Sequence, residues 1–264
     1  MTNKILAFSL ISLFATKMFA GNFVVGEICF ETMKDKSSVC VAICKTSDSM
    51  LVIPEHVEWK GVTYQVEAVS PYAFIESKQL KTIEIPALCS TMPTTAFLCC
   101  KELEKIYVAS GNTVFCDIDG VLFNSDRTKL LHYPRGRNVS QYSIPQSVTC
   151  ISENAFFKNT YLQEVIFPNS LIQICNAAFL GCSKLASITL PNKLEYLGSY
   201  AFYDCNNLMT VNVENDKAFS LGEHVFSYNT CKSGHVLLKG KETHLMKETF
   251  SKKGFEKFEI VESN

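Results

Sequence analysis

Residues 178–191 read Ala-Phe-Leu-Gly-Cys-Ser-Lys-Leu-Ala-Ser-Ile-Thr-Leu-Pro, and this stretch decides the fold because versions of it recur along most of the chain. Each recurrence begins with Ala-Phe or a close variant, and the phenylalanines are Phe74, Phe97, Phe156, Phe179, Phe202, Phe226 and Phe250. Their spacing is 23 or 24 residues, except between Phe97 and Phe156, where an insertion lengthens it to 59. A fixed period of this length is typical of a solenoid in which each repeat forms one coil.

A second pattern follows each phenylalanine and predicts a short strand. In residues 185–190 it consists of Leu185, Ile188 and Leu190, and the same three positions are apolar in four other coils. The alternation at its end places two side chains inward and one outward. Proline closes the pattern in three coils and turns the chain. The sequence therefore predicts a leucine-rich repeat solenoid of 23-residue coils, mostly β, with irregular or short helical turns.

Composition limits the classes of function that the chain can have. The chain has 264 residues, with 25 basic and 26 acidic side chains and a net charge of -1. This balance excludes a nucleic-acid binder that depends on counterion release, so we expect no nucleic-acid partner. Apolar residues make up 47% and charged residues 19%, which is enough apolar surface to bury a substantial core.

The first twenty residues predict export. Lys4 precedes an apolar run from Ile5 to Phe14, and the small residue Ala20 closes the segment. This is the layout of a secretory signal peptide, and the run is too short to span a bilayer. No later stretch is long and apolar enough for a membrane helix. We therefore expect a secreted, cell-surface or periplasmic protein without a membrane span.

The repeat unit at residues 178–191 resembles the BspA-type leucine-rich repeat family, and the resemblance covers roughly residues 50–260. Phe23 to Cys44 is similar to the β-hairpin that opens these proteins. The resemblance implies an exported, often surface-associated protein that acts in adhesion or binds host or matrix components. We expect the following organisation: a signal peptide at 1–20, an N-terminal β-hairpin cap at 21–50, and a solenoid at 51–264 with a β-hairpin insertion at 109–140 and degenerate capping coils at 227–264.

The insertion carries a motif that suggests a different class of function. Asp117-Ile118-Asp119-Gly120-Val121-Leu122 is similar to the first motif of haloacid-dehalogenase-type phosphatases, in which Asp117 would be the nucleophile and Asp119 the acid or base beside magnesium. That chemistry needs the motif at the carboxyl edge of a parallel sheet, with further catalytic groups on other strands. The chain instead returns to coils soon afterwards. We favour a β-hairpin that turns at Asp119-Gly120, and no enzymatic activity.

The positions of the cysteines predict a role in core packing rather than in catalysis or metal binding. Cys100, Cys182 and Cys205 each stand three residues after a recurrent phenylalanine, so we expect them to be buried, small and reduced. Cys29 and Cys40 are a candidate disulfide across the N-terminal hairpin, with Cys44 as a competing partner. The cysteines and histidines lack zinc-ligand spacing, so we expect no metal and no cofactor.

The outward residue of each strand gives the candidate binding surface. Solenoids use such extended faces to bind partner proteins, and the predicted column is Glu84, Tyr107, Ser143, Ile166, Thr189, Asn212, Leu237 and Glu259. Tyr107, Ile166 and Leu237 are its apolar or aromatic contact points. The expected partner is a host, matrix or cell-surface protein. The alternative is a structural spacer without a specific ligand, and a hairpin projecting from the stack is a second candidate surface.

Overall fold

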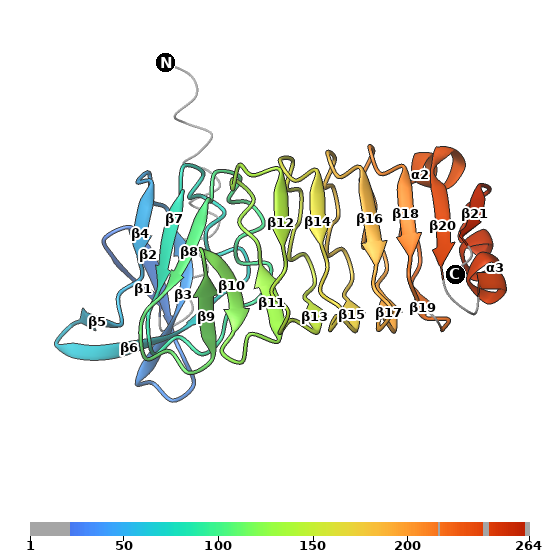
Figure 1. Ribbon diagram of the computed structural model, residues 1–264. Coiled ribbons are helices and arrows are strands. Elements are labelled where there is room, and N and C mark those ends of the chain that lie inside the picture. The colour runs from blue at the N-terminus through green and yellow to red at the C-terminus, as the bar shows by residue number, and fades with distance from the viewer. Residues whose placement is uncertain (1–21, 216, 240–242, 262–264) are drawn as a thin grey trace, which may run out of the picture.

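Short strands stack side by side along one long axis in the computed structural model, which describes residues 22–215, 217–239 and 243–261 (Figure 1). About nine turns follow one another at a spacing of roughly 23 residues, so the predicted solenoid is confirmed. The helices of the described part, α2 (Tyr228–Ser233) and α3 (Thr243–Lys252), lie in the last coils. The predicted signal peptide at 1–20 lies outside the described residues.

The N-terminal cap has more strands than the predicted hairpin. It is a five-stranded sheet in the order β1-β2-β3-β6-β5, made of β1 (Asn22–Val25), β2 (Ile28–Thr32), β3 (Ser38–Cys44), β6 (Val62–Val69) and β5 (His56–Trp59). Gly26, at φ +59°, makes the tight turn that folds β1 back onto β2. The chain after residue 50 then adds the β5–β6 hairpin to the same sheet, where β6 pairs in parallel with β3.

Two walls of parallel strands enclose the rest of the core. The front wall consists of β4 (Met50–Val52), β7 (Thr82–Ile85), β8 (Lys105–Val108), β12 (Gln141–Ser143), β14 (Glu164–Ile166), β16 (Ser187–Leu190), β18 (Thr210–Val213), β20 (His235–Lys239) and β21 (Phe258–Val261). The rear wall consists of β11 (Lys129–His132), β13 (Cys150–Ile151), β15 (Gln173–Ile174), β17 (Tyr196–Leu197) and β19 (Ser220–Leu221). Most neighbouring strands within each wall pair in parallel, so successive coils superpose.

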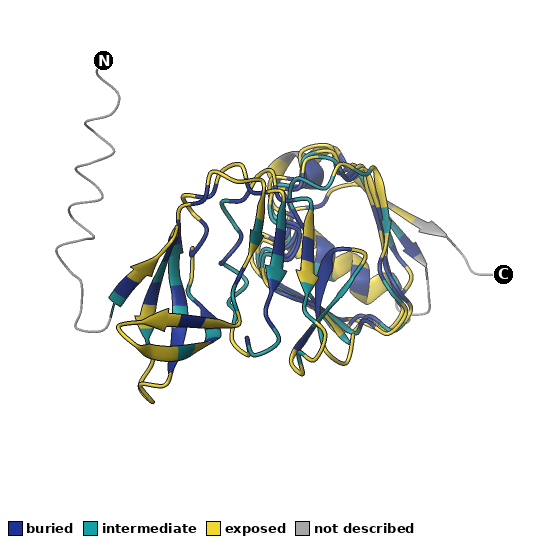
Figure 2. Cartoon of the chain, turned by 90° about the vertical axis from the view of Figure 1, so that its left-hand side faces the viewer, coloured by how far each residue is buried: buried dark blue, intermediate teal, exposed yellow. Residues whose placement is uncertain are grey.

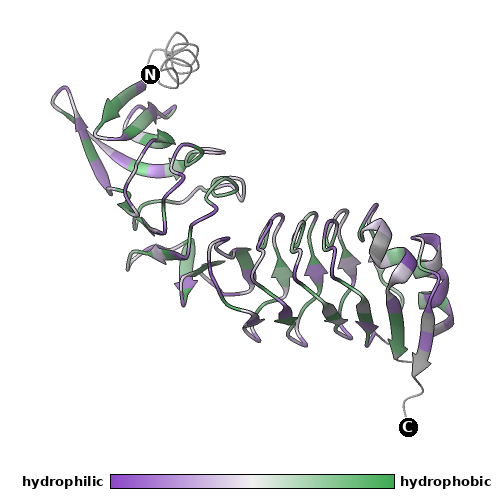
Figure 3. Ribbon diagram, turned by 90° about the horizontal axis from the view of Figure 1, so that it is seen from above, coloured by the Kyte–Doolittle hydropathy of each residue, from purple (hydrophilic) through white to green (hydrophobic). Residues whose placement is uncertain are grey.

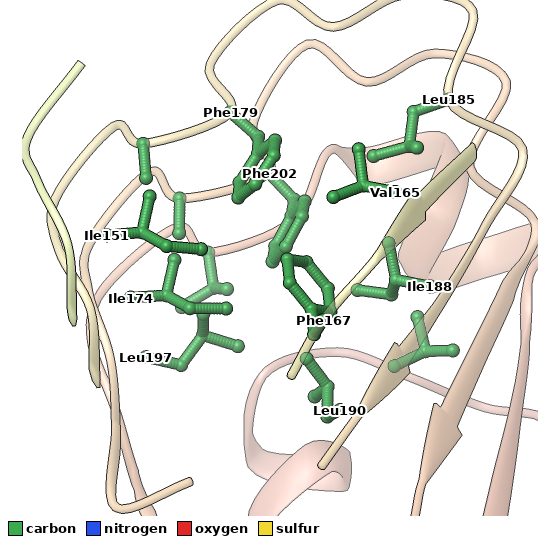
Figure 4. Packing of buried hydrophobic residues seen from close by; sticks show 14 of the residues in the cluster. Ile151, Val165, Phe167, Ile174, Phe179, Leu185, Ile188, Leu190, Leu197 and Phe202 are labelled. Atoms are coloured by element: carbon green, nitrogen blue, oxygen red, sulfur yellow. The ribbon is translucent and has the colours of Figure 1, made fainter. Parts of the chain in front are cut away.

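The recurrent phenylalanines form a stack of rings between the two walls. All seven are buried, and ring centroids in neighbouring coils lie 4.4 Å apart for Phe156 and Phe179 and 5.0 Å apart for Phe179 and Phe202. Figure 4 shows Phe179 and Phe202 between the rear-wall side chains and the front-wall strands. At the insertion, Tyr133 continues the stack with its ring 4.8 Å from that of Phe156.

The side chain three residues after each of five phenylalanines hydrogen-bonds to the coil before it. The thiols of Cys182 and Cys205 donate to the carbonyl oxygens of Phe156 and Phe179, with donor–acceptor distances of 3.2 and 3.1 Å. Cys100, Ser77 and Asn159 donate in the same way to the carbonyls of Phe74, Cys44 and Pro134 respectively. The three cysteines are therefore buried free thiols, as predicted, and they also link successive coils.

The insertion is part of the stack and does not project from it, so the prediction of a projecting hairpin is wrong. Its strands β9 (Phe115–Ile118) and β10 (Val121–Asn124) turn at Asp119-Gly120, as predicted, with φ angles of 51° and 76°. β10 then pairs with β11, which pairs in parallel with β13. Apolar side chains of β10 and β11, Phe123 and Leu130 among them, are fully buried and anchor the meander to the core.

The buried residues form two hydrophobic clusters that meet at this insertion. One extends from the cap to Ile106 and includes Phe115 and Leu122 of the insertion. The other extends from Val121 to Phe255. The N-terminal part is offset from the straight stack that follows it (Figure 3). Backbone hydrogen bonds join the two parts, from the Gly136 amide to the Leu103 carbonyl at 2.7 Å and from the Ile106 amide to the Gly120 carbonyl at 3.0 Å.

Replacing Gly136 with alanine is expected to lower the free energy of unfolding by about 1–3 kcal/mol, as overpacking in a tight site does. A Cβ atom at this position would lie 2.5 Å from the carbonyl carbon of Glu102, so the junction would have to open. Urea denaturation measures the effect. The control is Asn138→Ala, an exposed position that should change stability by less than about 0.5 kcal/mol. Equal stability of Gly136→Ala and wild type would contradict the close approach.

Candidate binding face of the solenoid

The structure places all eight residues of the predicted column on front-wall strands, in three groups. Glu84 pairs with Tyr107, and Ser143 pairs with Ile166. Thr189, Asn212, Leu237 and Glu259 are successive partners in the last group. The column is therefore divided between three parallel sheets and is not one continuous ladder.

Alternation along each strand points these side chains away from the core. In β7 the side chains of Ile83 and Ile85 are fully buried, and Glu84 between them is half-buried. In β16 the exposed Thr189 lies between the buried Ile188 and Leu190. Exposed and buried residues alternate on the strands in Figure 2. Two apolar or aromatic residues of the column are clearly exposed, Tyr107 at 39% and Ile166 at 42%, whereas Leu237 is half-buried.

The structure adds a strand at the N-terminal end of this face. Met50 and Val52 on β4 are each 53% exposed, and Val52 pairs with Glu84. Sequence reasoning missed them because no Ala-Phe pair precedes β4. A sequence signal for this strand was nevertheless present, because Ile53-Pro54 stands at its end as Ile85-Pro86 stands at the end of the next front-wall strand. A second outward row also runs beside the column, formed by Thr82, Lys105, Gln141, Glu164, Ser187, Thr210 and His235.

Many polar side chains of the face are paired along the solenoid axis. The amide nitrogen of Gln141 donates to a carboxylate oxygen of Glu164 at 2.7 Å, and that of Asn212 donates to the Thr189 hydroxyl at 3.1 Å. At the edge of the first group, the Lys81 ammonium lies 3.0 Å from Glu104, whose hydrogen bond raises the pKa of Lys81. These contacts hold the polar groups in place around the exposed Tyr107 and Ile166.

The turn of the insertion lies in the break between the first two groups. The Gly120 carbonyl accepts a hydrogen bond from Ile106 on β8, which places the turn at the edge of that strand. The Asp119 carboxylate is largely exposed and forms an ion pair with the Arg137 guanidinium. Arg137 also lies over the ring of Tyr133, 5.8 Å from its centroid. The insertion therefore contributes a charged pair to the same face.

The strand that carries Asp117 does not have the arrangement that the phosphatase alternative requires. β9 pairs antiparallel with β10, so its end is not the carboxyl edge of a parallel sheet. A carboxylate oxygen of Asp117 accepts a hydrogen bond from the Val108 amide at 2.9 Å, which ties the insertion to β8. Among the residues that the structure describes, no three His, Cys, Asp or Glu side chains are grouped to hold a metal ion.

The structure does not place Cys29 opposite Cys40, its candidate disulfide partner. In the antiparallel register of β2 and β3, Cys29 lies opposite Ile43 and Cys40 lies opposite Glu31. A register shift between Cys29 and Phe30 accompanies this offset. Both cysteines are free, and burial raises the pKa of each thiol.

A sequence profile of the BspA type leucine rich repeat region matches residues 58–126 and 133–260 in six copies. The chain belongs to the BspA-type leucine-rich repeat family. No curated protein sequence matches this BspA-type chain, and none of the helices in its described part is long and apolar enough to span a bilayer.

Solved structures similar to this BspA-type protein are bacterial repeat proteins. A leucine-rich repeat protein from Eubacterium ventriosum has a TM-score of 0.58 at 16% identity, over 82% of this chain and 77% of its own. A leucine rich cell surface protein from Faecalibacterium prausnitzii has a TM-score of 0.55 at 14% identity, over 92% and 95%. The leucine-rich repeat protein of T. pallidum has a TM-score of 0.50 at 18% identity, over 91% and 99%. At these identities the likeness shows the shared fold.

Proposed function

We propose that this BspA-type protein binds a partner protein through its front wall and catalyses no reaction. The observation that carries the proposal is the exposure of Tyr107 and Ile166, with Met50 and Val52 at the N-terminal end, on a face whose polar side chains are paired along the axis. Large apolar and aromatic side chains surrounded by polar groups supply most of the binding energy in protein interfaces. Stacked strands hold both residues in fixed positions, which reduces the entropy lost on binding.

The proposal includes export and action in adhesion at or outside the cell surface. The layout of residues 1–20 supports export, and the Faecalibacterium prausnitzii protein of similar fold is described as a cell surface protein. The proposed partner is a host, matrix or cell-surface protein. A spacer without a ligand is the contrary outcome of the experiment below.

Replacing Ile166 with aspartate is expected to weaken partner binding about ten-fold or more, as loss of a central apolar contact does. Tyr107→Ala should act in the same direction. Matrix and host-cell surface proteins are the ligands to test, with dissociation constants measured by surface plasmon resonance on the purified chain.

The matched control is Ile172→Asp. Ile172 is 39% exposed, close to the value for Ile166, but it precedes rear-wall strand β15 and lies off the front wall. Partner binding should be unchanged in this variant. The absence of any specific ligand, or equal weakening by both aspartates, would favour the spacer.

A further inference from the structure

Two cysteines of the rear wall lie close enough to react with each other. Cys150 begins β13, and Cys175 directly follows β15, the neighbouring parallel strand. Their sulfur atoms are 3.7 Å apart, which is hydrogen-bonding distance for two thiols. Both residues are half-buried, so neither is sealed inside the core. The pair thus combines proximity with partial exposure.

The cysteines of the phenylalanine stack differ from this pair in burial. Cys182 and Cys205 are almost completely buried, and each thiol donates to a backbone carbonyl of the coil before it. Burial keeps external disulfides away from their sulfurs and disfavours the thiolate that would react. Oxidation should therefore favour Cys150 and Cys175 over the cysteines of the phenylalanine stack.

Local electrostatics makes Cys150 the reactive member. The hydrogen bond from Cys175, helped by the nearby Lys129 ammonium and opposed by burial, lowers the pKa of Cys150 to about 7. The same hydrogen bond raises the pKa of Cys175, which keeps its proton. The lowered pKa favours the thiolate form of Cys150, and the thiolate is the nucleophile in disulfide exchange.

We propose that Cys150 and Cys175 form a modification site that closes to a disulfide in an oxidising compartment and joins two neighbouring coils covalently. The oxidant is an external disulfide, either oxidised glutathione or a disulfide oxidoreductase. The Cys150 thiolate attacks one of its sulfurs, breaks the external bond and releases one thiolate, which leaves a mixed disulfide on Cys150. Cys175 gives its proton to the released thiolate and attacks the Cys150 sulfur, which expels the second external thiolate; that thiolate takes a proton from solvent. Two electrons pass to the external disulfide, which becomes two thiols.

The required movement is small. A disulfide has a sulfur–sulfur distance of about 2.05 Å, so the two atoms must approach by about 1.7 Å. Cys150 begins the two-residue strand β13 and Cys175 directly follows the two-residue strand β15, so side-chain rotation and a slight shift of the chain can accommodate this change. The bond would close a loop between residues 25 positions apart, which restricts the unfolded chain and stabilises the coils.

The experiment uses the purified full chain in glutathione buffers that range from reduced to oxidised. After free thiols are alkylated, peptide mass spectrometry should find Cys150 linked to Cys175 in oxidised buffer. The melting temperature should rise by about 5–10 °C, and dithiothreitol should reverse both changes. In Cys175→Ser, glutathione should remain attached to Cys150, because the second thiol that would expel it is gone. In the wild type, the rate at which the link forms should rise with pH, because the Cys150 thiolate is the attacking form.

The control variant is Cys182→Ser, which keeps a donor for the Phe156 carbonyl and should form the same link. The wild-type mapping requires no substitution, so a folding defect in a variant cannot hide the result. Complete alkylation of both thiols in oxidised glutathione would overturn the proposal. So would a link from either cysteine to a third one, or attachment of glutathione to Cys175→Ser at another cysteine in preference to Cys150.

Discussion

Replacing Phe179 with alanine is expected to lower the free energy of unfolding by about 3–5 kcal/mol. The ring is fully buried, stacks between Phe156 and Phe202, and meets Phe167 edge-on at 5.6 Å. The neighbouring coils cannot collapse into the vacated space, because the Phe179 amide is bonded to the Ala201 carbonyl at 2.8 Å. The loss therefore includes the cost of a cavity in addition to the lost burial of the ring.

Urea denaturation of the purified chain measures this loss. Tyr228→Ala is the control. Tyr228 has an aromatic side chain like Phe179, but it lies in the C-terminal coils and is 73% exposed. Its removal should change the free energy of unfolding by less than about 1 kcal/mol. A similar decrease in the free energy of unfolding for the two substitutions would show that the phenylalanine stack is not a main source of core stability.

Acidification from pH 7.5 to pH 4 is expected to lower the stability of the wild type by about 3 kcal/mol more than that of His132→Leu. His132 is buried against the ring of Phe97, and neither of its ring nitrogens has a hydrogen-bond partner among the described residues. Burial lowers the pKa of His132 to about 4, from about 6.5 in the unfolded chain. Between these values the unfolded chain binds a proton that the folded chain does not, so the stability falls as the pH falls.

The measurement is urea denaturation of both proteins at several pH values. Carboxylates with lowered pKa, such as Glu223, also lose stabilising interactions in acid, but they do so equally in both proteins. Ser152→Ala is the second control, because it removes a buried hydroxyl without a partner in the described structure and leaves His132 in place. It should shift the stability by the same amount at every pH. Parallel pH curves for wild type and His132→Leu would show that His132 is protonated without strain in the folded state.

The periodic phenylalanines made the coils predictable because each one marks the same point in a repeat of nearly constant length. Strand alternation then predicted which residues face outward, and Asp119-Gly120 predicted the turn of the insertion. The division of the face into three sheets was not predictable in this way. Periodicity shows which side of a strand is buried, whereas the break between β8 and β12 depends on how β11 joins the rear wall at the insertion. The break between β14 and β16 falls between two coils of ordinary length, where the repeat pattern is unchanged.

Two pairs of cysteines also show that the sequence pattern alone does not predict which side chains lie close together. Alternation places Cys29 and Cys40 on neighbouring strands, but a register shift beside Cys29 moves them out of line. Cys150 and Cys175 are 25 residues apart, two more than the usual period, so they do not occupy equivalent positions in their coils. Their approach is diagonal across two paired strands and becomes visible only when both backbones are placed.

The hydrogen bond from the residue three positions after each of five phenylalanines has a consequence for how such a protein changes in size. Its donor belongs to one coil, and its acceptor is a main-chain carbonyl of the coil before, as for Cys182 and Cys205. Any preceding coil has such a main-chain carbonyl whatever its side chains, so the hydrogen bond does not depend on the sequence of that coil. An in-frame duplication or deletion of one whole coil therefore leaves the joints on both sides intact, and the length of the molecule is open to change by recombination in single-repeat steps.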